Sequence, residues 1–297
     1  MFSRFNMKTV AIWLVIIMVC SFFIAGIIFR STNGSWFLDF DNFSWSDNSD
    51  HSGSFTKDFD ENKTFTLDGI DKISADTIST SINIIPVDTP EIKVHYYGHY
   101  SGNTELKFVA ETSAGNLNLK EEYSKRNNIN TYKSDLKLDI YVPKAFTKSL
   151  NINTVSGSLK VQDMNIEDFN FNSVSGELEA NTLYTKNSSI TSVSGDLNIS
   201  GFKGDVTVKT TSGEITLNYA EFDNNININT VSGNTSLKLT DNAQFHIKYT
   251  TISGDIDSRY PITIQGKASS KGIEGYVGSE KNNIIVNSIS GSLEINK

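Results

Sequence analysis

Acidic residues recur after Ser-Gly pairs in the second half of this 297-residue chain. Glu177, Asp196, Glu214 and Asp255 each stand directly after such a glycine. Several carboxylate oxygens together suit a hard cation such as Ca²⁺, and carboxylates also accept hydrogen bonds from sugar hydroxyls. The simpler interpretation is that the four side chains point into water at a turn, where stacked like charges repel one another. The four residues are therefore a candidate ligand-facing strip.

Other chemistry finds little support in the sequence. The glycine-rich nonapeptide of calcium-binding β-rolls is absent, which weakens the calcium interpretation. His95 and His99 would lie about 13 Å apart on a strand, too far to share a metal. A glycan-cleaving β-helix enzyme needs two carboxylates in different environments, and no such pair stands out from the strip. We expect no catalytic residue, no cofactor and no metal, and hence no enzyme.

A short phrase of the type Thr-Val-Ser-Gly organises the strip and its surroundings. It occurs seven times with a period of about 19 residues, and the last interval is close to two periods. Such a period predicts stacked, similar coils, as in a solenoid. The glycines of the phrase are Gly157, Gly176, Gly195, Gly213, Gly233, Gly254 and Gly291.

Alternating apolar and polar residues flank each copy of the phrase, as around Leu150 and Ile152. This period of two is typical of half-buried strands. Each coil is therefore predicted as a strand, a Ser-Gly corner, a second strand and a looser turn. We expect the corner glycines to adopt positive φ, and the preceding hydroxyls to bond to the corner backbone or along the stack. Residues 270–273 fall where one copy is missing and are interpreted as a decayed repeat.

The composition excludes several classes of protein. The net charge of −8 and the lack of a basic stripe argue against nucleic acid as a partner. The single cysteine rules out an internal disulfide. Few prolines and many β-branched residues are typical of a β-rich chain.

Residues 10–29 are uncharged and long enough to cross a bilayer as one transmembrane helix. A cleaved signal peptide is the alternative, but the apolar run is too long for one and no clear cleavage site follows. Arg4 and Lys8 precede the span, whereas aspartates follow it. This bias predicts a single-pass cell-membrane protein with residues 1–9 in the cytoplasm and the body exported.

Three further segments follow the predicted span. Residues 30–63 are rich in Ser, Asn and Asp and are predicted to form an acidic stalk. Residues 64–149 keep the strand alternation without the Ser-Gly phrase, so we expect irregular opening β-coils. Residues 150–297 are predicted to be the regular solenoid. Because the chain stops soon after the last repeat, we expect Leu293 and Ile295 to lie in an open terminal coil that invites pairing.

The run from Gly69 to Gly98, the segment Leu136–Pro143 and the Ser-Gly ladder together resemble the bacterial putative adhesin family, which includes LiaG-like membrane proteins associated with envelope stress. The resemblance covers about residues 64–297. It implies an exported β-solenoid of undefined biochemical role, and it brings no catalytic residues with it.

The sequence thus predicts an all-β, single-stranded β-solenoid behind one membrane helix. The function that we expect is non-enzymatic binding or scaffolding at the cell envelope, linked to its stress response. Cell-wall glycan or another envelope protein would be the partner. The alternatives are a structural solenoid that associates end to end with itself and, less favoured, a glycan-acting β-helix enzyme.

Overall fold

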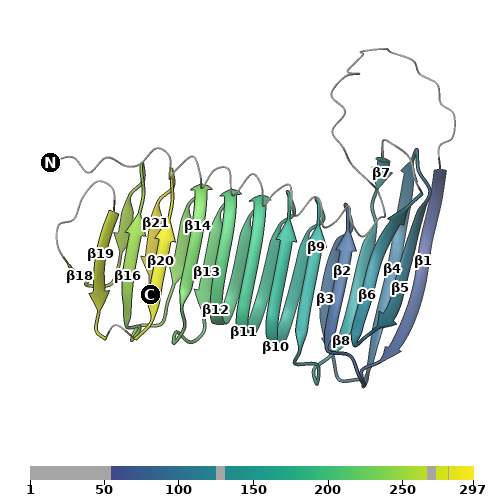
Figure 1. Ribbon diagram of the computed structural model, residues 1–297, viewed down its shortest axis with the longest axis horizontal. Coiled ribbons are helices and arrows are strands. Elements are labelled where there is room, and N and C mark those ends of the chain that lie inside the picture. The colour runs from purple at the N-terminus through teal and green to yellow at the C-terminus, as the bar shows by residue number, and fades with distance from the viewer. Residues whose placement is uncertain (1–54, 125–130, 266–271, 280) are drawn as a thin grey trace, which may run out of the picture.

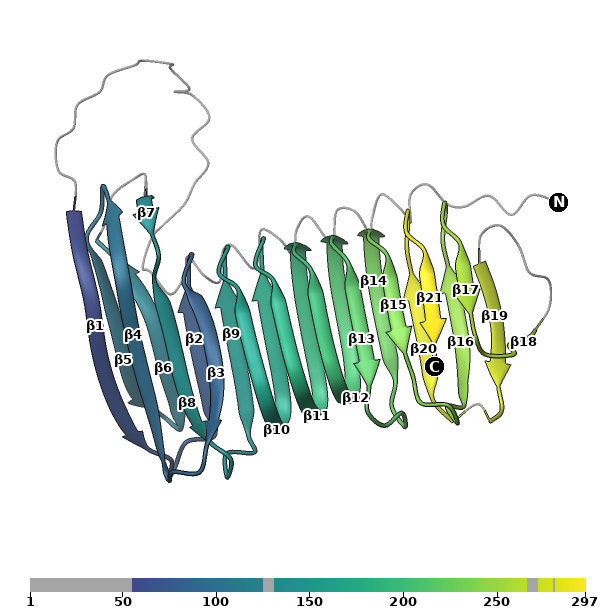
Figure 2. The same cartoon turned by 180° about the vertical axis from the view of Figure 1, so that it is seen from behind.

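The computed structural model describes residues 55–124, 131–265, 272–279 and 281–297. Within them, 21 strands join in one mixed sheet that folds over into two faces. The strands lie side by side along the long axis of the body, with β1 at one end and β18 and β19 at the other (Figures 1 and 2). The all-β class is confirmed, and most neighbouring coils pair in parallel as a solenoid requires.

Face 1 contains the strands that lead into the Ser-Gly corners, together with their neighbours. In spatial order, its strands are β5 (Leu106–Ser113), β6 (Asn116–Tyr123), β2 (Lys72–Thr77), β9 (Ser149–Thr154), the second halves of β10 (Leu159–Ser173), β11 (Leu178–Ser194) and β12 (Leu197–Ser212), then β14 (Ile226–Ser232), β20 (Asn283–Asn287), β16 (Phe245–Thr250), β19 (Gly272–Val277) and β18 (Thr263–Ile264).

Face 2 contains the strands that leave the corners. In the same direction, its strands are β1 (Phe55–Thr66), β4 (Glu91–Gly102), β8 (Lys137–Pro143) with β7 (Thr131–Ser134), β3 (Ser81–Val87), the first halves of β10, β11 and β12, then β13 (Ile215–Tyr219), β15 (Thr235–Lys238), β21 (Leu293–Asn296) and β17 (Ile256–Ser258).

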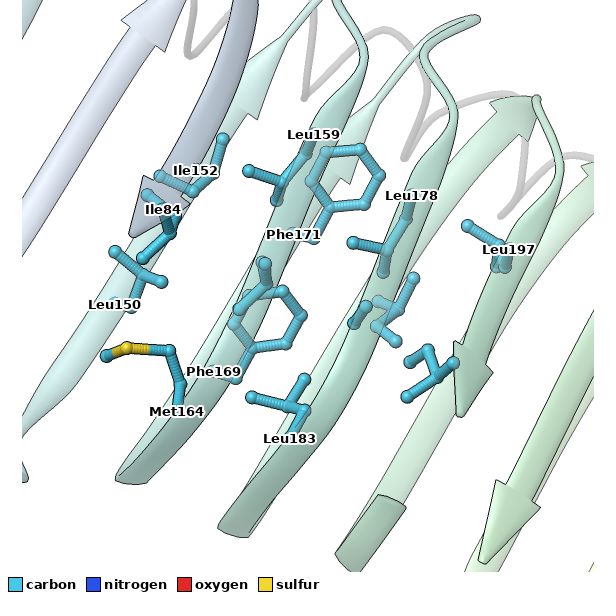
Figure 3. Close-up of a cluster of buried hydrophobic side chains, with 14 of the residues drawn as sticks. Ile84, Leu150, Ile152, Leu159, Met164, Phe169, Phe171, Leu178, Leu183 and Leu197 are labelled. Carbon is cyan, nitrogen blue, oxygen red and sulfur yellow. The ribbon is translucent and has the colours of Figure 1, made fainter. Parts of the chain in front are cut away.

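The core lies between the two faces and is built from stacked, equivalent side chains. Leu159, Leu178 and Leu197 are register partners on successive coils, and all three are buried (Figure 3). Phe169 and Phe171 of face 1 are fully buried beside them. One coil cannot bury its apolar side alone, so the stack supplies the hydrophobic stabilisation, about 25 cal/mol for each Å² of apolar surface removed from water.

The Ser-Gly corners need glycine for a reason other than the one expected. Of the seven corner glycines only Gly213 has a left-handed φ, of 124°, so the expectation of positive φ is wrong for the other six. A Cβ on Gly176 would instead overlap the carbonyl oxygen of Gly157 on the neighbouring coil, and every other corner glycine meets its neighbour in the same way. The corners therefore approach too closely for any side chain.

Left-handed backbone recurs at the opposite bend of the coils, termed the lower bend, where β10, β11 and β12 pass from one face to the other. Asp163 has φ 44°, Thr182 has φ 57° and Gly201 has φ 63°. The strand registers place these three residues one above another. The lower bend is thus a stacked left-handed turn, which the phrase pattern did not indicate.

The N-terminal end departs from the predicted boundaries. β1 begins at Phe55, so residues 55–63, expected in the stalk, belong to the sheet. β2 and β3 form a true coil that stacks in parallel on β9 and β10. Beyond it, β1, β4 and β5 run antiparallel to their partners, so the expected opening coils end in an antiparallel cap.

The chain reverses its stacking order at the C-terminal end. β20 lies between β14 and β16, and β21 lies between β15 and β17. Leu293 and Ile295 are accordingly buried, so the expected open terminal coil at this strand is wrong. Gly272 and Ile273 belong to β19, which pairs antiparallel with β16, and the predicted decayed repeat is wrong at these residues; residues 270 and 271 lie outside the described part.

Among the residues that the structure describes, no helix has the length and apolar character needed to cross a membrane. The predicted cytoplasmic segment, the span at 10–29 and the stalk up to residue 54 lie outside the described residues.

Candidate functional site

The predicted acidic strip is only partly brought together. Glu177, Asp196 and Glu214 lie on three successive coils. Backbone hydrogen bonds join these coils: the amide of Leu178 donates to the Asp196 carbonyl at 3.0 Å, and the amide of Leu197 donates to the Glu214 carbonyl at 2.9 Å. All three side chains are exposed. Asp255 is also exposed but lies apart from them, because β15 and β21 lie between β13 and β17.

Asn234 and Ser292 separate Asp255 from the other three acids. The amide of Ser292 donates to the side-chain oxygen of Asn234 at 3.0 Å, and the amide of Asp255 donates to the Ser292 hydroxyl at 3.3 Å. Asp196 is likewise engaged, because its carboxylate accepts the amide of Glu214 at 2.8 Å. Of the four carboxylates, that of Asp196 is thus bonded to the neighbouring turn backbone. No group of three His, Cys, Asp or Glu side chains in the described ranges is arranged to hold a metal ion.

The two neighbouring histidines lie on face 2 and pair with the terminal strand. His95 Nε2 lies 2.8 Å from Asp60, and His99 Nδ1 lies 2.6 Å from Asp58. Both aspartates are on β1. Each histidine therefore links β4 to the terminal strand β1, and the two histidines do not act together.

Face 1 carries a feature that sequence reasoning missed: three straight rows of polar side chains that alternate with the core residues and cross the coils. Most of these side chains are at least partly exposed, but Ser74 and Asn153 are buried. The register between strands aligns them. The first row contains Ser149, Asp168, Asn187, Asp205, Asn225 and Asn283. The second, termed the central row, contains Asn118, Ser74, Asn151, Asn170, Ser189, Thr207 and Asn227. The third row contains Asp76, Asn153, Asn172, Thr191, Lys209, Asn229 and Asn287.

The two outer rows are bonded internally. In the third row, Asn153 donates to Asp76 at 2.6 Å and Asn172 donates to Asn153 at 2.9 Å. Burial, the largest influence, raises the pKa of the Asp76 carboxyl, and the bond from Asn153 opposes that rise. In the first row, Asn187 donates to Asp168 at 3.0 Å. These amide ladders run from coil to coil and stabilise the stack.

The central row behaves differently. Within the described residues, no hydrogen bond engages the side chains of Asn118, Ser74, Asn151, Asn170, Ser189 or Thr207. Asn227 accepts one from Asn229 at 3.1 Å. None of the seven side chains carries a charge. The alternation of Asn in Asn151-Ile152-Asn153 was visible in the sequence, but only the register shows that such residues align.

A buried carboxylate joins the N-terminal cap to the first coil. Glu121 of β6 accepts the amide of Ile78 at 2.9 Å, the Tyr96 hydroxyl at 2.9 Å and the Tyr123 hydroxyl at 3.1 Å, and it also accepts from the Thr80 hydroxyl. Burial and the nearby Glu121 charge raise the pKa values of Tyr96 and Tyr123 strongly. All donors are internal groups of the fold, so this cluster is a structural joint.

Comparisons with known proteins find several similar structures and one matching family. Similar solved structures include a putative cell adhesion protein from Clostridium sporogenes, with 17% identity, coverage of 81% of this chain and 99% of that chain, and a TM-score of 0.35. A putative adhesin from Bacteroides fragilis has 12% identity, coverage of 80% and 97%, and a TM-score of 0.42. A putative adhesin from Parabacteroides merdae has 14% identity, coverage of 80% and 96%, and a TM-score of 0.40.

No curated protein matches the chain. The family described as Toastrack DUF4097 matches residues 70–296, which include nearly the whole described body. The resemblance inferred from the Ser-Gly ladder is thereby confirmed at the level of the family, and the chain belongs to the Toastrack DUF4097 family.

Proposed function

We propose that this protein is a non-enzymatic binding or scaffold protein of the cell envelope, held in the membrane by residues 10–29 with its body exported. Its partner would be an extended component of the envelope, such as wall glycan or the surface of another envelope protein. Similar solved structures carry the names putative adhesin and putative cell adhesion protein, and those names describe those proteins. For this chain the proposal rests on its own surface.

The observation that carries the proposal is the set of three polar rows on face 1. Each row repeats a hydrogen-bonding group at every coil, about 4.8 Å apart along the stack. A repeating surface of this kind matches a repeating partner better than a small molecule. Rigid stacking holds the groups in place, so little conformational entropy is lost when they bind.

Two other functions fit the structure less well. For end-to-end association, the N-terminal cap carries charged side chains: Lys57 and Lys63 lie over the rings of Phe59 and Phe108, and Glu61 lies within 4.0 Å of both lysines. Charges placed on a terminal strand oppose pairing with a second copy. For a glycan-cleaving enzyme, the exposed strip offers carboxylates in similar surroundings rather than the two distinct ones that the chemistry needs.

Sedimentation tests the proposed function directly. The full-length chain, reconstituted in lipid vesicles, is mixed with purified bacterial cell-wall sacculi or with washed membranes that carry their proteins. We expect the chain to bind one of these fractions saturably, while vesicles without protein do not. Failure to bind either fraction would remove the proposal.

A further inference from the structure

We propose that the central row of face 1 binds an uncharged, extended polysaccharide that lies along the long axis of the body. The inference rests on the proposed function and names its ligand class and its site. The occupied surface would cross β6, β2, β9, β10, β11, β12 and β14 in that spatial order, as the strands run in Figure 1.

The chemistry of the row selects for hydroxyl-rich ligands. Asn118, Asn151 and Asn170 each offer two amide donors and one carbonyl acceptor, and Ser189 and Thr207 each offer a hydroxyl that can donate and accept. None of these five side chains has a hydrogen-bond partner within the described residues. Sugar hydroxyl and acetamido groups need both donors and acceptors, so the row matches them in kind.

The electrostatics of face 1 disfavour an anionic polymer. The seven members of the central row are uncharged. The neighbouring rows contain the carboxylates of Asp76, Asp168 and Asp205 and, over the same strands, the cations Lys72, Lys120 and Lys209, of which Lys120 is paired with Glu111 and Glu122. The whole chain has a net charge of −8. The flanking charges of opposite sign roughly balance, so face 1 offers a phosphate- or sulfate-bearing chain no basic patch to set against the net negative charge of the protein, whereas a neutral chain needs none.

The dimensions of the row favour a polymer over a single sugar. Seven strands at about 4.8 Å spacing give a row roughly 29 Å long. That spacing is close to the rise per sugar in an extended β-linked chain, so successive rings can meet successive coils. Each contact is weak in water, and affinity should therefore grow with the number of sugars bound.

The row ends where its character changes. Beyond Asn227 the register continues to Ile285 on β20 and Lys248 on β16, and Lys248 forms an ion pair of 3.2 Å with Glu274. An aliphatic side chain and an ion pair offer a sugar chain no free amide. The proposed site is therefore limited to the strands from β6 to β14, where every member of the row has an amide or hydroxyl side chain.

The test uses the full-length chain in detergent micelles and a fluorescent hexamer of β-1,4-linked N-acetylglucosamine as the probe, with binding followed by fluorescence anisotropy. The dimer of the same sugar and a polyglycerol phosphate of similar length are competitors. We expect the unlabelled hexamer to compete at least tenfold better than the dimer, and the polyglycerol phosphate not to compete. Competition by the dimer or the polyglycerol phosphate equal to that of the hexamer would overturn the inference.

Variants locate the site. The double variant Asn151→Ala, Asn170→Ala should weaken hexamer binding at least tenfold. The matched control Asn198→Ala, Asn218→Ala removes two outward asparagines from face 2 and should leave binding unchanged. Should the first double variant lose its fold, Asn170→Asp keeps the side-chain shape while replacing amide donors with a charge, and it should also lose binding.

The possible failures are distinguishable. If the wild-type chain binds sacculi or membranes but central-row variants bind them equally well, this inference falls and the proposed function stands. If the wild-type chain binds neither fraction and no oligosaccharide, both fall.

Discussion

Close approach between coils decides which residues can occupy the corners. Gly176 sits directly against the Gly157 carbonyl, and its own amide donates to the Ser173 hydroxyl at 2.6 Å. The glycine leaves room for the next coil at all seven corners. At Gly157 and Gly176 the hydroxyl three residues earlier also closes the turn by accepting the glycine amide. The equivalent hydroxyls of Ser192, Thr230, Thr251 and Ser288 are buried without a hydrogen-bond partner among the described residues, so the expected bond to the corner backbone is not general.

Gly176→Ala should destabilise the body although its backbone angle suits alanine. The added Cβ would push the Gly157 carbonyl away and disturb the coil pairing, at a cost of about 1–3 kcal/mol, as is usual for overpacking. Urea denaturation followed by circular dichroism measures the change. Ser175→Ala, on the exposed side of the same corner, should stay within about 0.5 kcal/mol of wild type. Equal midpoints for both variants would contradict the close-approach explanation.

At the lower bend, a substitution is expected to stabilise the fold rather than destabilise it. Thr182 is β-branched and left-handed, whereas Gly201 holds the equivalent place on the next coil. Thr182→Gly should therefore raise the free energy of unfolding by about 1 kcal/mol, because it relieves the strain of a branched residue in that region. Thr191→Gly, in the regular part of the same strand, should lower it instead. A destabilised Thr182→Gly would show that the bend is not strained.

The partly buried Asp76 makes the stability of the fold depend on pH. Burial raises its folded-state pKa above the ordinary 3.8, so its favourable contribution is present below pH 4 and is lost as the pH rises through the folded pKa. Asp76→Asn keeps an acceptor for Asn153 without the charge. We expect this variant to melt higher than wild type at pH 7 and at the same temperature near pH 3. A constant difference between the two pH values would contradict the burial of a charged Asp76.

Elements are held together at the N-terminal end by the Glu121 joint. β6 supplies the carboxylate, β4 supplies Tyr96, and the turn between β2 and β3 supplies the Ile78 amide and Thr80. The antiparallel cap is thereby bonded to the first parallel coil. A solenoid end covered in this way does not leave its apolar cross-section open to water.

This joint predicts an alkaline sensitivity. The raised pKa of Tyr123 means that the folded protein keeps its proton above pH 10, where the unfolded chain releases it, so stability falls as the pH rises above 10. Tyr123→Phe loses the hydrogen bond to Glu121 and should be less stable at pH 8 by about 1.5–3 kcal/mol. Because the variant lacks this titration, the difference should shrink between pH 9 and pH 11. Tyr132→Phe, 64% exposed, should match wild type throughout. A difference that does not narrow would disprove this role of Tyr123.

At the scale of the whole molecule, the regular coils were predictable because each copy of the phrase repeats the same physics. Corner glycines and alternating Leu and Ile residues specify strand, turn and strand, and the all-β class follows. The central row was not predicted, although Asn151 and Asn170 are plain in the sequence. Their alignment depends on register between coils, which periodicity along one chain shows only indirectly.

The order of the coils escaped prediction for a related reason. The last repeat, with Leu293 and Ile295, and the preceding one, with Ile256, have similar patterns and could each stack on β15. Local sequence does not distinguish these two arrangements. In the structure, β19 pairs with the outer edge of β16, and the last repeat fills the space inside. The inversion also adds the Ser292 coil to the Asn234 coil that already lies between Glu214 and Asp255 in sequence order, so it widens the gap in the candidate strip.

Cysteine pairs on face 2 test this inverted order. In a Cys20→Ser background, Ser236→Cys with Glu294→Cys joins neighbours on β15 and β21, and Glu294→Cys with Asp257→Cys joins neighbours on β21 and β17. Adjacent strands lie about 4.8 Å apart, within reach of a disulfide, so both pairs should form one under mild oxidation. Ser236→Cys with Asp257→Cys spans two strand spacings, about 9.6 Å, and should stay reduced. Gel mobility before and after reduction, with mass spectrometry of the linked peptides, measures all three. If the third pair forms a disulfide readily and the first does not, the coils stack in sequence order and the last repeat lies at the end of the body.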